Sequence, residues 1–536
     1  YYLQIKLRII YVFLQRKFTV TMIITELQQL YAAHPNVEGM CRLLKDNSVR
    51  HLYCSGLCAS AASLFSSVLV QRAECPFVFI LGDLEEAGYF YHDLTQILGA
   101  ERVLFFPSSF RRAIKYGQKD AANEILRTEV LSRLQKGEEG LCVVTCPDAL
   151  AEKVVSRKEL GDKTLKLHTG EKVDMDFVTE VLRSYGFEYV DYVYEPGQYA
   201  VRGSIIDVFS FSSECPFRID FFGDEVESIR TFEVESQLSK EKKEDIVIVP
   251  DLSRSLEQGG NGGMVSFLDF LRPDTLLAMR DFLWLRERIQ AVHDESLTAA
   301  AIAAREAEEN GAISLEGKLI DGGEFTLRAL DFRRMEFGTK PTGTPDATVS
   351  FSTAAQPIFH KNFDLVAESF QDYLARNYTL YICSDSLKQT DRIRAIFEDR
   401  GNNISFTPVE RTLHEGFADD TLRLCIFTDH QLFDRFHKYN LKSDKARSGK
   451  VALSLKELNQ FTPGDYVVHT DHGVGRFTGL VRIPNGDTTQ EVMRLVYQND
   501  DVVFVSIHSL HKVSKYKGKE GEAPRLNKLG TGAWEK

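Results

Sequence analysis

The alternation of hydrophobic and polar positions is clearest between Gly197 and Phe232. β-Branched and aromatic residues alternate there with polar ones between tight turns, which predicts two or three strands. In the strand after the first turn, the two-residue period puts three apolar residues on one face: Phe217, Ile219 and Phe221. This is an ordinary core face.

The opposite face of the same strand is unusual, because it carries Arg218, Asp220 and Phe222. Arg202, one strand earlier, could lie beside them. Arginine and an exposed aromatic residue on a flat sheet face are typical of a protein-binding surface. The alternative from the pattern alone is a half-exposed phenylalanine beside a cross-strand ion pair.

Upstream of this stretch, strand patterns alternate with helical ones. Helical periodicity runs from Ile24 to Leu44, and a further helix is predicted around Ala121 to Leu134. The predicted strands are Val49 to Cys54, Phe77 to Leu81, Val103 to Phe106 and Leu141 to Thr145. Such alternation predicts a mostly parallel α/β sheet.

The segment from Val49 to Val70 has the skeleton of a phosphate-binding loop: a strand, a glycine turn at Gly56 and a small-residue helix. A working loop needs GxxxxGK[ST], because its lysine neutralises the phosphates and its hydroxyl holds Mg²⁺. The positions of that motif carry Ala61, Ala62 and Ser63 or their neighbours. We therefore expect a degenerate P-loop-type domain that binds no nucleotide.

The pattern changes from about Thr164 to a helix with an antiparallel sheet, which predicts an inserted α+β module ending near Pro250.

Ser296 to Glu309 is a strong helix by propensity. Tyr378 to Phe436 repeats the α/β alternation and predicts a second small α/β domain, in which Asp385 and Asp429 are expected to cap helices. Phe461 to Tyr516 has short strands separated by Gly, Pro and Asn turns, typical of a small β-barrel.

Composition adds few constraints. At 536 residues the chain is too long for one core, and its net charge of −12 gives no electrostatic support for nucleic-acid binding.

The two CxxxC pairs, Cys54/Cys58 and Cys142/Cys146, lie in apolar runs and indicate buried free thiols rather than a zinc site. The cluster His469, Asp471 and His472 lacks a further ligand, so hydrogen bonding in a turn is favoured over a metal. No apolar run in residues 1–21 could span a membrane, and we expect an extension without function there.

The run YAVRGSIIDVF…PFRIDFFGDEVESIRTF resembles a module shared by the excision-repair protein UvrB and the bacterial transcription-repair coupling factors. In that family it docks the damage-recognition protein UvrA. The resemblance implies a UvrA-binding site at Arg202, Arg218, Asp220 and Phe222, with Phe222 as the anchor and the arginines paired with acidic groups of UvrA. UvrB also has a tyrosine-rich hairpin before its PSS motif, and only Val103 to Phe106 precedes Pro107 here, which favours the coupling factors.

The run PGDYVVHTDHGVGRFTGL resembles the RNA-polymerase-interacting domain of the same factors, which CarD-type regulators share. By position, the resemblance implies that the strand Leu480 to Ile483 meets the polymerase β subunit. Ile483 would be the apolar anchor, with Leu480 beside it and Arg476 and Arg482 as flanking charges.

The family's motor has no counterpart in this sequence, since no GxxxxGK[ST] motif occurs in it. The resemblance therefore implies an adaptor without a cofactor or metal of its own, while ATP, Mg²⁺ and most DNA contacts belong to the motor. It also implies a cytoplasmic monomer that does not bind membranes. The alternatives are a UvrB-like repair protein, a nucleotide-dependent enzyme using the loop at Gly56, and a CarD-like transcription regulator.

Together the patterns and the resemblance divide the chain into residues 1–21 (extension), 22–163 (first part of the α/β domain), 164–252 (UvrA-binding module), 253–363 (rest of the α/β domain), 364–440 (small α/β domain without an assigned role), 441–460 (linker), 461–517 (polymerase-binding barrel) and 518–536 (start of the link to a motor).

Overall fold

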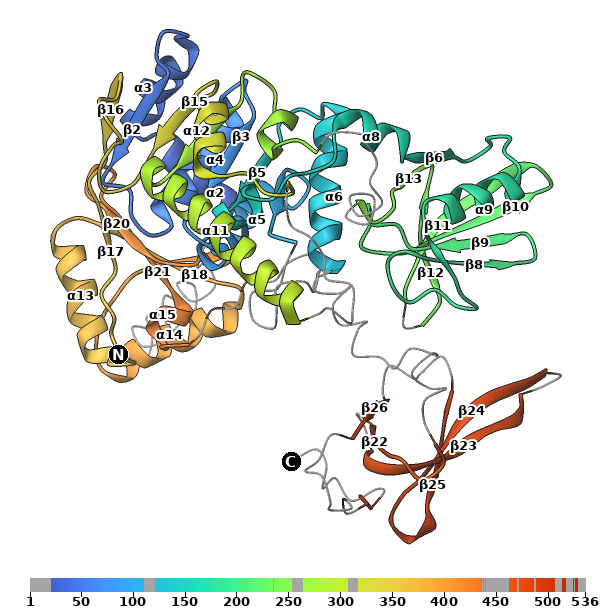
Figure 1. Cartoon of the computed structure of the whole chain (residues 1–536). Coiled ribbons are helices and arrows are strands. Elements are labelled where there is room, and N and C mark those ends of the chain that lie inside the picture. Colours follow the sequence, from blue (N-terminus) through green and yellow to red (C-terminus); the bar gives the residue numbers. More distant parts are fainter. Residues whose placement is uncertain are drawn as a thin grey trace. The chain divides into compact units, whose positions relative to one another are not determined.

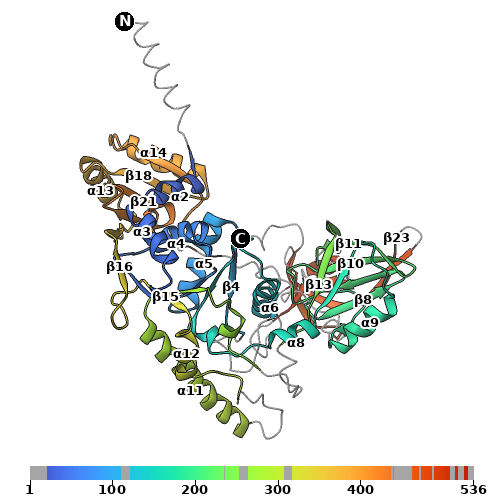
Figure 2. The same ribbon diagram turned by 90° about the horizontal axis from the view of Figure 1, so that it is seen from above.

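The structure is a computed structural model (Figures 1 and 2). It describes residues 21–109, 121–234, 236–252, 264–306, 317–435, 437, 439, 462–469, 472–485, 488–506, 513–516, 524 and 526–528. The chain forms two compact units. One comprises residues 1–119, 130–157 and 261–441, and the other comprises residues 120–129, 158–260 and 442–536. Each is described by itself.

The first unit contains a seven-stranded sheet in which every pairing is parallel, as the α/β alternation predicted. Its strands, in spatial order, are β16 (Ala347–Ser350), β2 (His51–Ser55), β15 (Arg333–Glu336), β14 (Leu276–Met279), β3 (Phe77–Ile80), β5 (Cys142–Thr145) and β4 (Val103–Phe106). β3, β4, β5 and β14 are buried along their whole length, which explains their unbroken apolar runs.

The helices and helical turns of this part of the first unit are α3 (Pro35–Lys45), α4 (Ala61–Arg72), α5 (Leu84–Leu98), α7 (Pro147–Leu150), η1 (Phe267–Phe270), α11 (Phe282–Glu306) and α12 (Gly322–Ala329). Two more helices, α6 (Ala121–Lys136) and α8 (Arg157–Asp162), span the boundaries between the two units. The helix expected from Ile24 to Leu44 is two helices, because Pro35 begins α3 and α2 (Ile24–Ala32) ends before it. A proline inside a helix would remove a backbone hydrogen bond, whereas at the first position it costs none.

A second, six-stranded sheet completes the first unit. Its strands, in spatial order, are β1 (Met22–Ile23), β19 (Thr407–Glu410), β18 (Thr379–Ser384), β21 (Leu424–Thr428), β20 (Phe417–Asp419) and β17 (Thr353–Ala355), and its helices are α13 (Phe363–Ala375), α14 (Leu387–Asp399) and α15 (Asp429–Leu432). β1 and β17 lie outside the expected range of 364–440. Strands of two and three residues are too short to show a periodic pattern.

The second unit contains the module that the opening alternation predicted, and Figure 1 shows α9 (Met175–Ser184) lying along its sheet. The sheet is ordered β12 (Ser239–Lys243), β11 (Glu225–Phe232), β10 (Phe217–Phe222), β9 (Ile205–Val208), β8 (Gln198–Arg202) and β7 (Glu188–Tyr189), and a separate pair joins β13 (Asp245–Ile248) to β6 (Leu165–His168). Val178 and Leu182 of α9 pack in one core with Ile219 and Phe221. The helix therefore covers the face predicted to be apolar.

The C-terminal part of this unit is a five-stranded antiparallel sheet ordered β25 (Val502–Ser506), β24 (Thr488–Val496), β23 (Gly473–Asn485), β22 (Tyr466–His469) and β26 (Val513–Lys515), with a helical turn η3 (Gln498–Asp500). The small antiparallel sheet was expected. The pairings among the described residues leave it open between β25 and β26, so they do not close it into the expected barrel.

Candidate protein-interaction surfaces

The charged face of the module is built from β8 to β11, and its strand alternation is confirmed. Phe217, Ile219 and Phe221 are buried, whereas Phe222 is 77% exposed. The register shifts after Asp220, so that Phe222 pairs with Glu225 at the end of the β10–β11 hairpin. A large aromatic side chain left in water at the tip of a hairpin has no role in the core, which makes it a candidate anchor for a partner.

The two arginines predicted to meet an acidic partner are held by this chain's own Asp207. The Arg218 Nε and Nη2 atoms donate to the two carboxylate oxygens of Asp207 over 2.8 and 2.9 Å, and Arg202 donates to the same carboxylate. The Asp207 side chain is completely buried. These hydrogen bonds raise the pKa of the Arg218 guanidinium above its ordinary value. A bidentate pair with a buried carboxylate fixes the position of the guanidinium.

Both arginines are therefore engaged within the chain, and their pairing with acidic groups of UvrA stays a prediction. The Arg218 guanidinium also stacks over the Phe232 ring at 4.6 Å, and that of Arg202 over the Tyr192 ring at 5.0 Å. Asp220 is likewise engaged, since it accepts hydrogen bonds from Arg230 and from the Ser228 hydroxyl. The alternative of a cross-strand ion pair is thus correct for the charges, while Phe222 remains without a core role.

The loop after β2, where a phosphate-binding loop would lie, is filled by the chain itself. The Thr353 hydroxyl donates to the Gly56 carbonyl oxygen (2.6 Å) and accepts from the backbone N–H of Cys58 (3.1 Å). A Cβ atom at Gly56 would lie 2.0 Å from the Phe351 carbonyl oxygen, so backbone packs directly on this turn. One backbone donor of this turn, the Cys58 N–H, is therefore already paired, and backbone fills the space next to Gly56.

A cavity of about 370 Å³ lies beside this loop, and its charge is wrong for a nucleotide. Its lining includes the carboxylates of Asp83, Glu85, Glu86, Asp93 and Glu415, against a single arginine, Arg280. Burial raises the pKa of Glu415. Carboxylates repel phosphate oxygens, so the surroundings as well as the missing lysine disfavour ATP.

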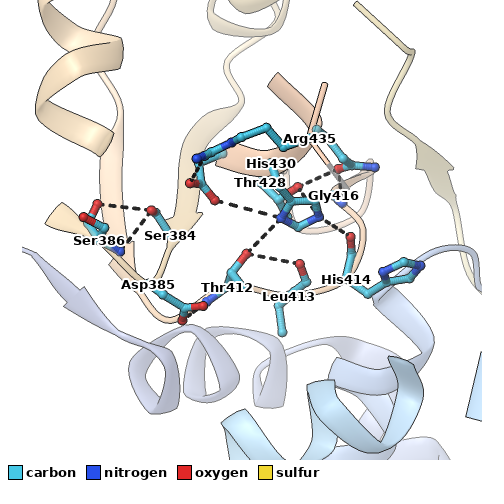
Figure 3. A network of polar contacts seen from close by, with 12 residues as sticks. Ser384, Asp385, Ser386, Thr412, Leu413, His414, Gly416, Thr428, His430 and Arg435 are labelled. Atoms are coloured by element: carbon cyan, nitrogen blue, oxygen red, sulfur yellow. Dashed lines mark hydrogen bonds and ion pairs between the residues drawn. The ribbon is translucent and has the colours of Figure 1, made fainter. Parts of the chain in front are cut away.

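The carboxyl edge of the second sheet, where ligands bind in many α/β proteins, carries a polar network (Figure 3). The His430 Nε2 atom donates to the carbonyl oxygen of His414 (2.7 Å), and its Nδ1 atom lies 3.4 Å from the Thr412 hydroxyl. Asp385 accepts from the backbone N–H of Thr412, and Asp429 pairs with Arg435. The expectation that these two aspartates cap helices is wrong, because the N-cap residues of α14 and α15 are Ser386 and Thr428.

Four histidines from α5 and from this edge lie close together. The His437 ring is centred 4.2 Å from that of His430, 5.8 Å from that of His414 and 5.0 Å from that of His92. Burial lowers the pKa of His414, His430 and His437 to about 4, so these rings are neutral at neutral pH. Among the described residues, no group of His, Cys, Asp and Glu side chains could hold a metal ion.

In the C-terminal sheet, Arg476 and Leu480 of β23 are exposed, the latter by 38%. Arg482 and Ile483 pair with Glu491 and Gln490 in the β23–β24 ribbon, but their side chains lie outside the described residues. His469 is buried in β22, and Asp471 of the same cluster also lies outside the described residues. The ribbon thus places the expected anchor in a strand, as the resemblance implied.

Comparison with known proteins identifies both interaction modules. Residues 165–253 match the UvrB interaction domain, and residues 461–517 match the CarD-like/TRCF RID domain. The chain matches the N-terminal half of transcription-repair-coupling factors. The transcription-repair-coupling factor of Staphylococcus aureus (strain bovine RF122 / ET3-1) is 24% identical over 562 residues, and that of Bacillus subtilis (strain 168) is 23% identical over 553 residues.

Both alignments cover 90% of this chain and 46% of the relative, so the chain spans about half the length of the coupling factors that it matches. Their motor region is not covered. No helix in the described ranges is both long and apolar enough to cross a membrane.

Two charged residues of the module face were missed from the sequence: Asp207 and Arg230. Asp207 lies within the apolar run IIDVF, and the run alone does not show which residues it binds. Arg230 is ten residues from Asp220 along the chain, and only the hairpin pairing brings the two together. Alternation within β11 could have placed Arg230 on a face with Ser228, but not opposite Arg218.

Proposed function

We propose that this chain is the adaptor part of a transcription-repair coupling factor, which docks on the β subunit of stalled RNA polymerase and recruits UvrA in the cytoplasm. The observation that carries the proposal is the presence, in one chain, of a UvrB interaction domain and a CarD-like/TRCF RID domain. One domain alone would fit a UvrB-like protein or a CarD-like regulator, whereas the pair fits a protein that joins excision repair to transcription.

The UvrA-docking face would be the charged face of the module. Phe222 is its apolar anchor, and its exposure is the main support for that role. Asp207 fixes the guanidinium of Arg202, which is 34% exposed, and Asp220 binds that of Arg230. Arg218 is less accessible, because its Nη1 atom also donates to the Gln237 carbonyl oxygen. A pre-set face loses less conformational freedom on binding than a flexible one, which favours affinity.

The polymerase contact would be the strand from Leu480 to Ile483, with Arg476 and Arg482 at its flanks. Its support is the RID match and the exposure of Arg476 and Leu480. The adaptor part would hydrolyse no ATP, because the loop at Gly56 lacks the lysine of a phosphate-binding loop and the cavity beside it is lined by carboxylates. ATP-driven translocation on DNA would belong to the motor of the full-length factor.

UvrA binding is tested by titrating fluorescently labelled chain with purified UvrA. Phe222→Ala should weaken binding by at least about 2 kcal/mol, roughly thirtyfold, as expected for a central anchor. Phe177→Ala is the matched control, because Phe177 is also a half-exposed phenylalanine of this module but lies on α9, which covers the opposite face. Equal affinities for wild type and Phe222→Ala would refute the assignment of this face.

Polymerase binding is tested by pull-down of the β subunit with wild type, Ile483→Arg and the conservative Ile483→Val. The arginine should abolish capture and the valine should preserve it, because only the first places a charge against apolar partner surface. Thermal melting of each variant separates lost contact from lost folding. Full capture by a folded Ile483→Arg protein would place the interface elsewhere.

A further inference from the structure

A row of cations crosses the module sheet beyond the residues that the resemblance points to. Backbone pairing sets Asp207 of β9 opposite Arg218 of β10, Arg218 opposite Arg230 of β11, and Arg230 opposite Lys242 of β12. Residues directly opposite in an antiparallel ladder point to the same face. Three cations therefore follow one carboxylate across the sheet, from the buried Asp207 to the edge strand β12.

The exposed cations of this face lie above buried carboxylates, while Arg218 in the middle of the row is only 15% exposed. The Asp207 side chain is 0% exposed and that of Asp220 15%, whereas those of Arg202 and Arg230 are 34% and 33% exposed. The surface that a partner meets is therefore cationic, although aspartates lie within hydrogen-bond distance beneath it.

The outer end of the row is accessible to a partner. The Arg230 side chain is 33% exposed, and its ion pair with Asp220 engages one of its terminal nitrogens. Lys242 is exposed, and no ion pair joins it to a described carboxylate, whereas its neighbours Lys240 and Lys243 pair with Glu233 and Glu241. Like charges directly opposite each other destabilise a sheet, so Arg218, Arg230 and Lys242 form a row that an acidic partner would stabilise.

We propose that the docking face extends along this row to β12, with Arg230 and Lys242 as further contacts for an acidic protein surface. The inference rests on the proposed function, since that surface would belong to UvrA. A protein fits better than a nucleic-acid backbone, because the same face carries the exposed Phe222 and the exposed carboxylate of Glu225 at the hairpin tip. A phosphate backbone would meet repulsion there and gain nothing from the aromatic ring.

Lysines on β12 also have an ordinary role, since charged side chains on an edge strand prevent it from pairing with other chains. The sign of the charge separates the two roles. A glutamate protects an edge as well as a lysine does, but it would repel an acidic partner.

The test compares Lys242→Glu with Lys243→Glu in the full chain by measuring association with UvrA at low and at physiological salt. Both variants change the net charge equally in the same strand, but Lys243 pairs with Ile229 of the apolar face and lies on the other side of the sheet. Lys242→Glu should slow association about three- to tenfold at low salt, with a smaller effect at physiological salt and little change in dissociation. Lys243→Glu should stay within about twofold of wild type.

Arg230→Ala should instead speed dissociation, because it removes a partly desolvated contact. Equal association rates for the two glutamate variants would overturn the proposed extension, and if Phe222→Ala still loses binding, the proposed function stands without it. If neither Phe222→Ala nor Lys242→Glu weakens binding to UvrA, both the proposed docking face and its extension are refuted. A competing duplex DNA that displaces UvrA from wild type but not from Lys242→Glu would assign the row to nucleic acid and overturn the inference.

Discussion

Replacing Asp207 by asparagine tests how far the module face depends on one buried carboxylate. Asparagine has nearly the same shape, but it carries no charge and turns an N–H₂ group toward guanidiniums that can only donate. Arg218 would lose a bidentate partner at 2.8 and 2.9 Å, and Arg202 would lose its charge-assisted hydrogen bond to the same carboxylate.

The loss in the free energy of unfolding of the module that we expect for Asp207→Asn depends on how deeply the ion pairs are buried. Removing one partner of a fully buried ion pair typically costs about 3–5 kcal/mol. Here the carboxylate is fully buried, but the side chains of Arg218 and Arg202 are 15% and 34% exposed, so both can recover some hydration. We therefore expect about 3 kcal/mol, the lower end of that range.

The chain has several domains, so a single unfolding transition would mix their stabilities. Hydrogen exchange measured by mass spectrometry on peptides from β9, β10 and β11 isolates the module, and about 3 kcal/mol corresponds to roughly 150-fold faster exchange by local opening. Asp220→Asn is the matched control, because Asp220 lies on the same face but binds a single arginine. Equal exchange in the two variants would refute the argument that Asp207 organises the face.

Three further predictions concern other parts of the chain. Phe221→Ala should destabilise the module by about 3–5 kcal/mol, because this side chain is 4% exposed, and the same exchange experiment would measure it. The first unit should become less stable as pH falls from 7.5 to 5.5, because the unfolded state gains protons near pH 6.5 while burial holds the pKa of His414, His430 and His437 at about 4. Hydrogen exchange of peptides from α5 and β21 at both pH values, corrected for the intrinsic pH dependence of exchange, should show this, and His437→Gln should reduce the slope by up to about 1.4 kcal/mol per pH unit. ATP with Mg²⁺ should neither bind nor be hydrolysed, and heat release on titration that disappears with chelation would contradict this.

The sequence predicts local geometry well where one face of an element is apolar. The burial of Phe217, Ile219 and Phe221 and the exposure of Phe222 follow from the two-residue period, since only one face of β10 meets α9. The parallel sheet was equally accessible, because its buried strands are continuous apolar runs separated by helices.

What the sequence could not provide is the pairing of polar groups that are distant along the chain. Whether Arg218 is free for a partner depends on Asp207, eleven residues earlier, and on a register that only strand pairing fixes. The same holds for Thr353, whose hydroxyl fills the loop at Gly56 from 297 residues away. At both places the residue types indicated which groups could bind a ligand. Whether those groups are available depends on the residues of this chain that bind them.

This difference in availability separates the two places where function was expected. At Gly56 the Thr353 hydroxyl accepts from the Cys58 N–H, the Phe351 carbonyl packs on the turn, and carboxylates line the space beside it. On the module face, internal pairing buries the carboxylates while Arg202 and Arg230 stay one-third exposed near an exposed phenylalanine. The ion pairs with the buried aspartates cover little of the surface that a partner would contact. They also restrict the arginine side chains before binding, so less conformational entropy is lost when a partner binds. The first arrangement excludes a ligand and the second prepares for one, which is why the adaptor function, rather than a nucleotide-dependent one, is proposed for this part of the factor.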